Sequence, residues 1–83
     1  MTLADHVTIT ELEHGAVLLD QRTGRYWQIN KTAHAILTQL RHTGTVDTAI
    51  EELRRRFPDE ADQVAADAEQ FVRTLRKAKL VTA

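Results

Sequence analysis

The chain has 83 residues, which is enough for one domain with a modest core and too few for a cleft between two subdomains. Eleven Lys and Arg residues nearly balance twelve Asp and Glu residues, so the net charge of −1 gives no global attraction to nucleic acid or to an anionic membrane. The absence of cysteine excludes a disulfide scaffold, a thiolate nucleophile and a zinc knuckle. We therefore expect a single domain over residues 1–83 whose function depends on its surface.

The first third of the chain has the hydrophobic period of β-strands. In residues 7–12 the apolar Val7, Ile9 and Leu12 are interspersed with polar residues, whereas residues 16–19 form an apolar run that suits the middle of a small sheet. Residues 25–29 are rich in β-forming side chains and follow a turn in which Gly24 can adopt a positive φ. This order predicts a three-stranded antiparallel β-meander.

The rest of the chain has the 3.6-residue period of amphipathic helices, which are predicted at residues 31–41, 46–57 and 59–78. Each helix starts at or just after a residue whose side chain can cap the first turn: Asn30, Thr45 and Asp59. The third helix has an apolar stripe about 140° wide, and Leu80 and Val81 are expected to close the core. Strands followed by helices predict an α+β fold.

The side chains that carry enzyme chemistry are scattered or absent. No recognised metal-ligand spacing connects the histidines, which are His6, His14, His34 and His42. The chain has neither serine nor cysteine, and its acidic pairs lie where solvated helix faces and helix starts ordinarily carry acids. We therefore expect no enzyme activity, no metal site and no cofactor. The N-terminal residues resemble neither a secretion signal nor a membrane anchor, which predicts a cytoplasmic protein with no membrane partner.

A basic run at residues 54–56 raises an alternative, a small winged-helix DNA-binding or regulatory protein. Such proteins need a basic recognition helix, but residues 59–78 contain five acids and only three bases. Phosphate would be repelled from that helix. We therefore expect no nucleic-acid partner.

The edge of the predicted sheet is the remaining candidate site. An edge strand exposes unpaired backbone N–H and C=O groups, and an extended peptide can pair with them. Residues 25–29 form such an edge. The third helix can supply an apolar wall from one margin of its stripe, either Ala65 and Val72 or Asp67 and Phe71, unless the whole stripe is core.

Three segments resemble the PqqD-like family, the precursor-peptide recognition elements of ribosomally made, modified peptides. They are LLDQRTGRYWQINKTA at residues 18–33, GTV at residues 44–46, where a helix opens, and LRKAKLV at residues 75–81. The resemblance extends from about Gly15 to Val81. The most similar form is the stand-alone leader-binding protein of lasso-peptide clusters, which acts with a separate transglutaminase-like leader protease. Relatives often have a small or apolar residue where this chain has His34.

The resemblance implies a winged-helix-like domain that binds the leader of a precursor peptide without performing chemistry. In this family the leader adds as a strand to the third strand of the meander and packs against the third helix. The docking edge would then be Arg25, Tyr26, Trp27, Gln28 and Ile29, and the facing wall Val64, Asp67, Ala68, Phe71, Val72 and Leu75. Tyr26 and Trp27 point to opposite faces of the strand, so only one of them is expected to contact the leader.

Overall fold

A computed structural model describes residues 1–82 of the chain. Its main sheet is antiparallel, with the strands β2 (Val7–Leu12), β3 (Gly15–Asp20) and β4 (Tyr26–Asn30) in that spatial order. The apolar run of β3 lies in the centre, where both neighbours satisfy its backbone, so β2 and β4 are the two edges. This confirms the predicted meander.

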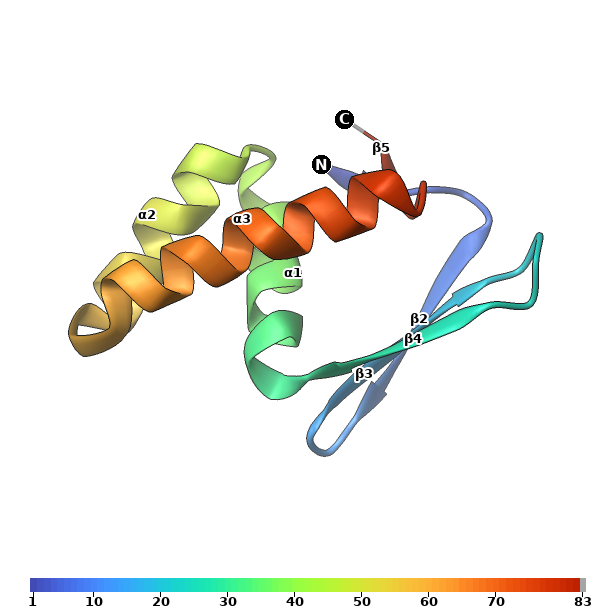
Figure 1. Cartoon of the computed structure of the whole chain (residues 1–83), viewed down its shortest axis with the longest axis horizontal. Coiled ribbons are helices and arrows are strands. Elements are labelled where there is room, and N and C mark those ends of the chain that lie inside the picture. The colour runs from blue at the N-terminus through green and yellow to red at the C-terminus, as the bar shows by residue number, and fades with distance from the viewer. Residues whose placement is uncertain (83) are drawn as a thin grey trace.

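Three helices follow the sheet: α1 (Lys31–Thr43), α2 (Val46–Arg56) and α3 (Ala61–Lys77). In Figure 1, α3 lies across α1, and β4 runs beneath the C-terminal half of α3 before it continues into α1. The predicted α+β order of a three-stranded sheet and then three helices is therefore confirmed. A two-stranded ladder between β1 (Thr2–Leu3) and β5 (Val81–Thr82) was not predicted, and it brings the two ends of the described chain together (Figure 1).

The starts of α1 and α2 follow from their capping residues. The Asn30 side chain accepts a hydrogen bond from the Ala33 N–H at 2.8 Å, and Thr45 accepts one from the Thr48 N–H at 3.2 Å. The prediction that Asp59 caps the third helix is wrong. Pro58 starts a 3₁₀ turn, η1 (Pro58–Glu60), which contains Asp59, and α3 begins after it without a side-chain cap.

The core has two parts, and α3 belongs to both. Between the helices, α3 contributes Val64, Ala65, Ala68 and Val72 to a buried cluster with α1 and α2. Between the sheet and the helices, Leu75 packs in a second cluster that contains residues of β2, β3, β4 and α1. Phe71 is partly buried and touches both clusters. Packing on two sides fixes α3, and this places its remaining margin beside β4.

The basic run of α2 is mostly accounted for by local pairing. The guanidinium groups of Arg55 and Arg56 lie 3.2 and 3.6 Å from the Glu52 carboxylate, one turn earlier on the same helix. With its amide oxygen turned toward α2, the buried Gln39 accepts two hydrogen bonds from Arg56, at 3.1 and 3.2 Å. No helix within residues 1–82 is long and apolar enough to cross a membrane.

Candidate functional site

The outer edge of β4 exposes a defined set of backbone groups. Within residues 1–82, β4 pairs only with β3, and the Asp20 N–H donates to the Arg25 carbonyl at 2.9 Å where the two strands begin to pair. Antiparallel strands alternate hydrogen-bonded and non-hydrogen-bonded residue pairs, so Trp27 and Ile29 also bond inward to β3. Tyr26 and Gln28 therefore direct their N–H and C=O groups outward, toward a potential fourth strand.

The two aromatic side chains of β4 lie on opposite faces of the sheet, as strand alternation predicted. Trp27 is partly buried and packs against the core cluster that contains Leu75 of α3. The Tyr26 side chain is 69% exposed on the other face. The Arg25 guanidinium lies 5.2 Å from the centre of the Trp27 ring, in the range of a cation–π contact. Trp27, and not Tyr26, is thus the aromatic residue beside α3.

Two hollows follow one another along the junction of β4 and α3. One, of about 300 Å³, is lined by Arg25, Trp27, Thr74, Lys77 and Ala78. The other, of about 320 Å³, lies where β4 passes into α1 and is lined by Asn30, Thr32, Ala33, Ile36, Asp67 and Phe71. We call these two hollows together the β4–α3 groove. It has apolar surfaces from Trp27, Ala33 and Phe71 next to a free strand edge.

The structure divides the expected wall of α3 into exposed and buried residues. Asp67 and Phe71 line the groove. The others are at most 4% exposed and belong to the core, namely Val64, Ala68, Val72 and Leu75. Of the two margins left open by the sequence, Ala65 and Val72 pack against α1 and α2, so the margin beside β4 is that of Asp67 and Phe71. On the strand, Ile29 is also buried. Which of these residues contact a ligand stays a prediction.

Several groove residues were missed from the sequence. On α3 and its C-cap these are Thr74, Lys77 and Ala78, and at the N-cap and start of α1 they are Asn30, Thr32, Ala33 and Ile36. The signal for Thr74 and Ala78 was present, because positions 67, 71, 74 and 78 follow the i, i+4, i+7, i+11 row of one helix face. The second group depends on how closely α1 follows β4, which no local pattern encodes.

The two ends of the groove carry opposite charges. Arg25 and Lys77 lie at the end where β4 begins, and neither forms an ion pair within residues 1–82. Asp67 lies at the end where α1 begins, and its carboxylate accepts a hydrogen bond from Gln63 at 2.9 Å. Unpaired charges beside apolar hollows are available to a ligand that extends along the groove.

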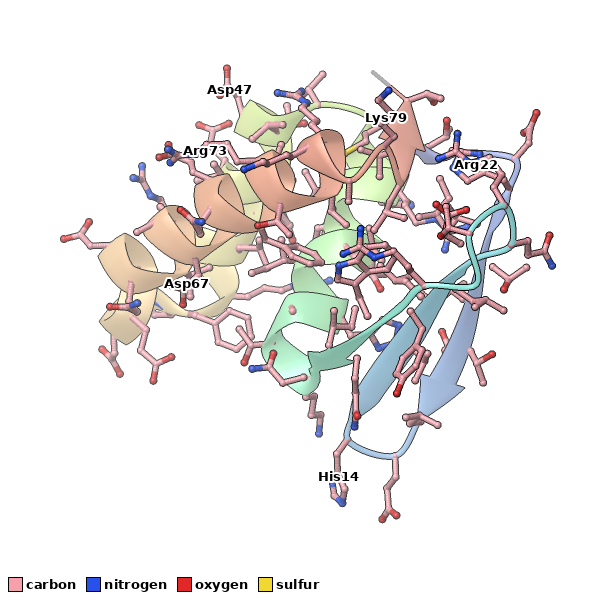
Figure 2. The ribbon with its side chains drawn as sticks, turned by 45° about the vertical axis from the view of Figure 1, so that its right-hand side comes forward. His14, Arg22, Asp47, Asp67, Arg73 and Lys79 are labelled. Atoms are coloured by element: carbon pink, nitrogen blue, oxygen red, sulfur yellow. The ribbon has the colours of Figure 1, made fainter. Side chains whose placement is uncertain are left out.

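A buried carboxylate holds the turn that leads into β4. Asp20 is 2% exposed and accepts hydrogen bonds from the Arg22 backbone N–H at 2.9 Å and from the Arg22 guanidinium at 3.3 Å. These contacts hold the pKa of Asp20 below its ordinary value, the side-chain hydrogen bond from Arg22 being the main cause. Figure 2 shows Arg22 at the upper end of the sheet and His14 at its lower end, at the tip of the β2–β3 hairpin. The turn thereby fixes where the exposed edge of β4 starts.

The described residues contain no group of three or more His, Asp or Glu side chains that could hold a metal ion. The four histidines are dispersed, and two of them contact carboxylates: His6 lies 4.0 Å from Asp20, and His34 lies 3.5 Å from Glu11. The β4–α3 groove itself presents outward backbone groups, apolar side chains and charged side chains.

Comparison with known proteins found a family and a shared fold. The sequence model described as Coenzyme PQQ synthesis protein D (PqqD) matches residues 15–81. A solved lasso peptide synthetase B1 complexed with the leader peptide is 26% identical, with a TM-score of 0.81 over 98% of this chain and 95% of that chain. TbiB1 in complex with the TbiA(beta) leader peptide shares the fold at 21% identity, with a TM-score of 0.81 over 96% of this chain and 93% of that one. No curated protein matches the chain. The match over residues 15–81 confirms the resemblance inferred from the sequence: the chain belongs to the PqqD family.

Proposed function

We propose that this protein binds the leader segment of a lasso-type precursor peptide in the β4–α3 groove and delivers it to a separate leader protease. The observation that carries the proposal is the free edge of β4 beside two hollows lined by Trp27 and Phe71. Membership of the PqqD family supports it, as do the leader complexes of two solved proteins that share the fold.

The leader would bind by strand addition. Its backbone pairs with the outward N–H and C=O groups of Tyr26 and Gln28, which gives affinity that depends little on sequence. Every second side chain of the leader then points toward α3 and enters the hollows beside Trp27 and Phe71. Aromatic walls bury a large area at a small cost in side-chain entropy, so these contacts provide both affinity and selectivity.

The protein itself performs no chemistry in this proposal. By holding the leader, it raises the effective concentration of the adjoining core peptide at a protease that binds the same domain. Cleavage then belongs to the separate transglutaminase-like protease. The groove suits this role because strand addition leaves the chain beyond the leader free to reach a second protein.

A fluorescence titration tests the proposal. Trp27 is the only tryptophan, and it lines the groove, so its emission should change when the leader of the cognate precursor binds. We expect saturable binding at micromolar concentration and none with a scrambled leader of the same composition. Phe71→Ala should weaken binding by about tenfold, whereas Phe57→Ala, at an exposed position after α2, should leave it unchanged. Absence of saturable binding at micromolar concentration would overturn the proposal.

A further inference from the structure

A third hollow, of about 480 Å³, lies at the opposite edge of the sheet from the groove, between β2 and α1. Its apolar lining comes from Leu3, Ile9 and Leu37. Its polar lining comes mainly from Glu11, His34, Arg41 and His42. We call it the β2–α1 pocket. It shares no lining residue with the β4–α3 groove.

The pocket adjoins the second free edge of the sheet. The His6 carbonyl accepts a hydrogen bond from the Gln21 N–H at 2.8 Å, which sets the alternation between β2 and β3. Thr8 and Thr10 therefore bond inward to β3, while Ile9 and Glu11 direct their backbone groups outward. Ile9 and Glu11 are also the β2 residues whose side chains line the pocket. A strand added here would place its own alternate side chains over the pocket.

An unpaired guanidinium in the pocket favours an acidic ligand. The carboxylate of Glu11 lies 3.5 Å from the imidazole of His34. Arg41 is exposed and forms no ion pair within residues 1–82, and His42 lies beside it. The helix dipole explains why the cation of Arg41 is stable in the last turn of α1. It does not explain why Arg41 lies beside apolar side chains next to an unpaired strand edge.

We propose that the β2–α1 pocket is a second peptide-binding site, which takes an extended acidic and apolar segment of a partner protein. The segment pairs with the backbone of Ile9 and Glu11, inserts an apolar side chain against Leu37 and places a carboxylate near Arg41. Because β2 and β4 are opposite edges of one sheet, both sites can be filled at once. The domain then holds one peptide segment at each edge of the sheet, and this raises the effective concentration of each segment near the other.

Nuclear magnetic resonance of the ¹⁵N-labelled protein tests this site directly. The probe is a synthetic octapeptide of alternating Leu and Glu, and its control is the matching peptide of alternating Leu and Lys. We expect saturable shifts of the Ile9, Glu11 and Arg41 amides with the acidic probe, and binding of the basic control that is weaker by about tenfold. The Trp27 indole signal, which reports on the other edge, should stay in place.

A charge reversal completes the test. Arg41 is exposed, so Arg41→Glu should retain the fold. In this variant the affinity for the acidic peptide should become equal to or lower than the affinity for the basic peptide. Leader binding by the same variant should change by less than about twofold, because Arg41 is remote from the groove. The inference is overturned if no shift saturates at millimolar peptide, if the shifts centre on β4, or if Arg41→Glu leaves the preference intact. Each of these results is independent of whether the leader binds at β4.

Discussion

The two edges of the sheet offer the same backbone chemistry but different surroundings. On β4 the outward groups belong to Tyr26 and Gln28, and on β2 they belong to Ile9 and Glu11. The β4 edge faces α3 across hollows lined by Trp27 and Phe71, whereas the β2 edge faces α1 across a pocket without Phe, Tyr or Trp. Since both strands are edges with unpaired backbone groups, we expect the neighbouring helix to decide which peptide each edge selects.

This difference ranks the two edges by expected affinity. Partly buried aromatic residues are frequent anchors of binding energy, and both of those in the groove, Trp27 and Phe71, contact the core as well. They are therefore held in place before a ligand arrives, which lowers the entropy lost on binding. The β2–α1 pocket relies on aliphatic side chains and exposed charge, so its binding should be weaker and more sensitive to salt.

The substitution with the largest expected effect disrupts the pairing of β4 with β3. Gly15 has a φ of 151° and lies opposite Asn30, and a Cβ at Gly15 would overlap the Ile29 carbonyl oxygen. Gly15→Ala should therefore lower the free energy of unfolding by about 3 kcal/mol. Gly24→Ala is the matched control, because its φ of 77° is also positive but its Cβ would meet open space.

The control should cost only about 1 kcal/mol. Urea denaturation of the three proteins measures both changes, and leader binding by the Gly15 variant should be lost together with the geometry of β4. Equal stability losses for the two substitutions would show that Gly15 does not hold β4 against β3.

The next largest effect is expected from a pair of substitutions on the two faces of β4. Trp27→Ala should weaken leader binding by about 100-fold, because it removes the aromatic wall and the platform for Arg25. Tyr26→Ala should change affinity by less than about threefold, since its side chain lies on the opposite face. Anisotropy of a labelled leader measures both without using tryptophan emission.

Trp27→Phe separates recognition from folding, because it keeps an aromatic ring in the core and should recover most of the affinity. Thermal melts establish that each variant is folded at the temperature of the assay. A larger loss for Tyr26→Ala than for Trp27→Ala would place the leader on the other face of the sheet.

A smaller effect concerns the turn that starts the β4 edge, and it depends on pH. Because hydrogen bonding to Arg22 lowers the pKa of Asp20 in the folded state, the carboxylate stabilises the fold above its unfolded pKa of about 4. This stabilisation is lost as the pH falls through the lower folded value. Asp20→Asn should therefore be less stable than the native protein at pH 7, and the difference should shrink in acid.

Urea denaturation at neutral and acidic pH measures this difference. Asp5→Asn is the control, because Asp5 is exposed and forms no ion pair within residues 1–82, and it should change stability little at either pH. If the Asp20→Asn difference were the same at both pH values, the carboxylate would not be what holds the turn.

Much of the fold could be predicted because its signals are local. Asn30 and Thr45 cap helices by contacts three residues ahead, and Gly24 and Gly44 adopt the positive φ values that glycine permits. The opposite orientation of Tyr26 and Trp27 also follows from strand alternation alone. Capping by Asp59 failed because Pro58 starts a 3₁₀ turn one residue earlier, which moves the start of α3 to Ala61.

The division of α3 between core and groove could not be predicted, because it depends on packing between distant segments. Val64 and Val72 have the same apolar character as Phe71, but α1 and α2 cover the first two and leave Phe71 partly exposed beside β4. The β2–α1 pocket likewise requires Ile9 and Arg41 to meet in space, although they are far apart in the sequence. Such contacts follow from the tertiary arrangement and produce no periodic pattern in the sequence.

A pair of proline substitutions tests most directly whether the leader adds to β4. Gln28→Pro and Glu11→Pro each remove one outward backbone N–H, on β4 and on β2 respectively, at edge positions where proline is tolerated. With both variants folded by circular dichroism, calorimetry with the cognate leader should show a loss of at least about tenfold for Gln28→Pro. Glu11→Pro should bind within about twofold of the native protein. Native affinity in Gln28→Pro, or an equal loss in both variants, would contradict strand addition at β4.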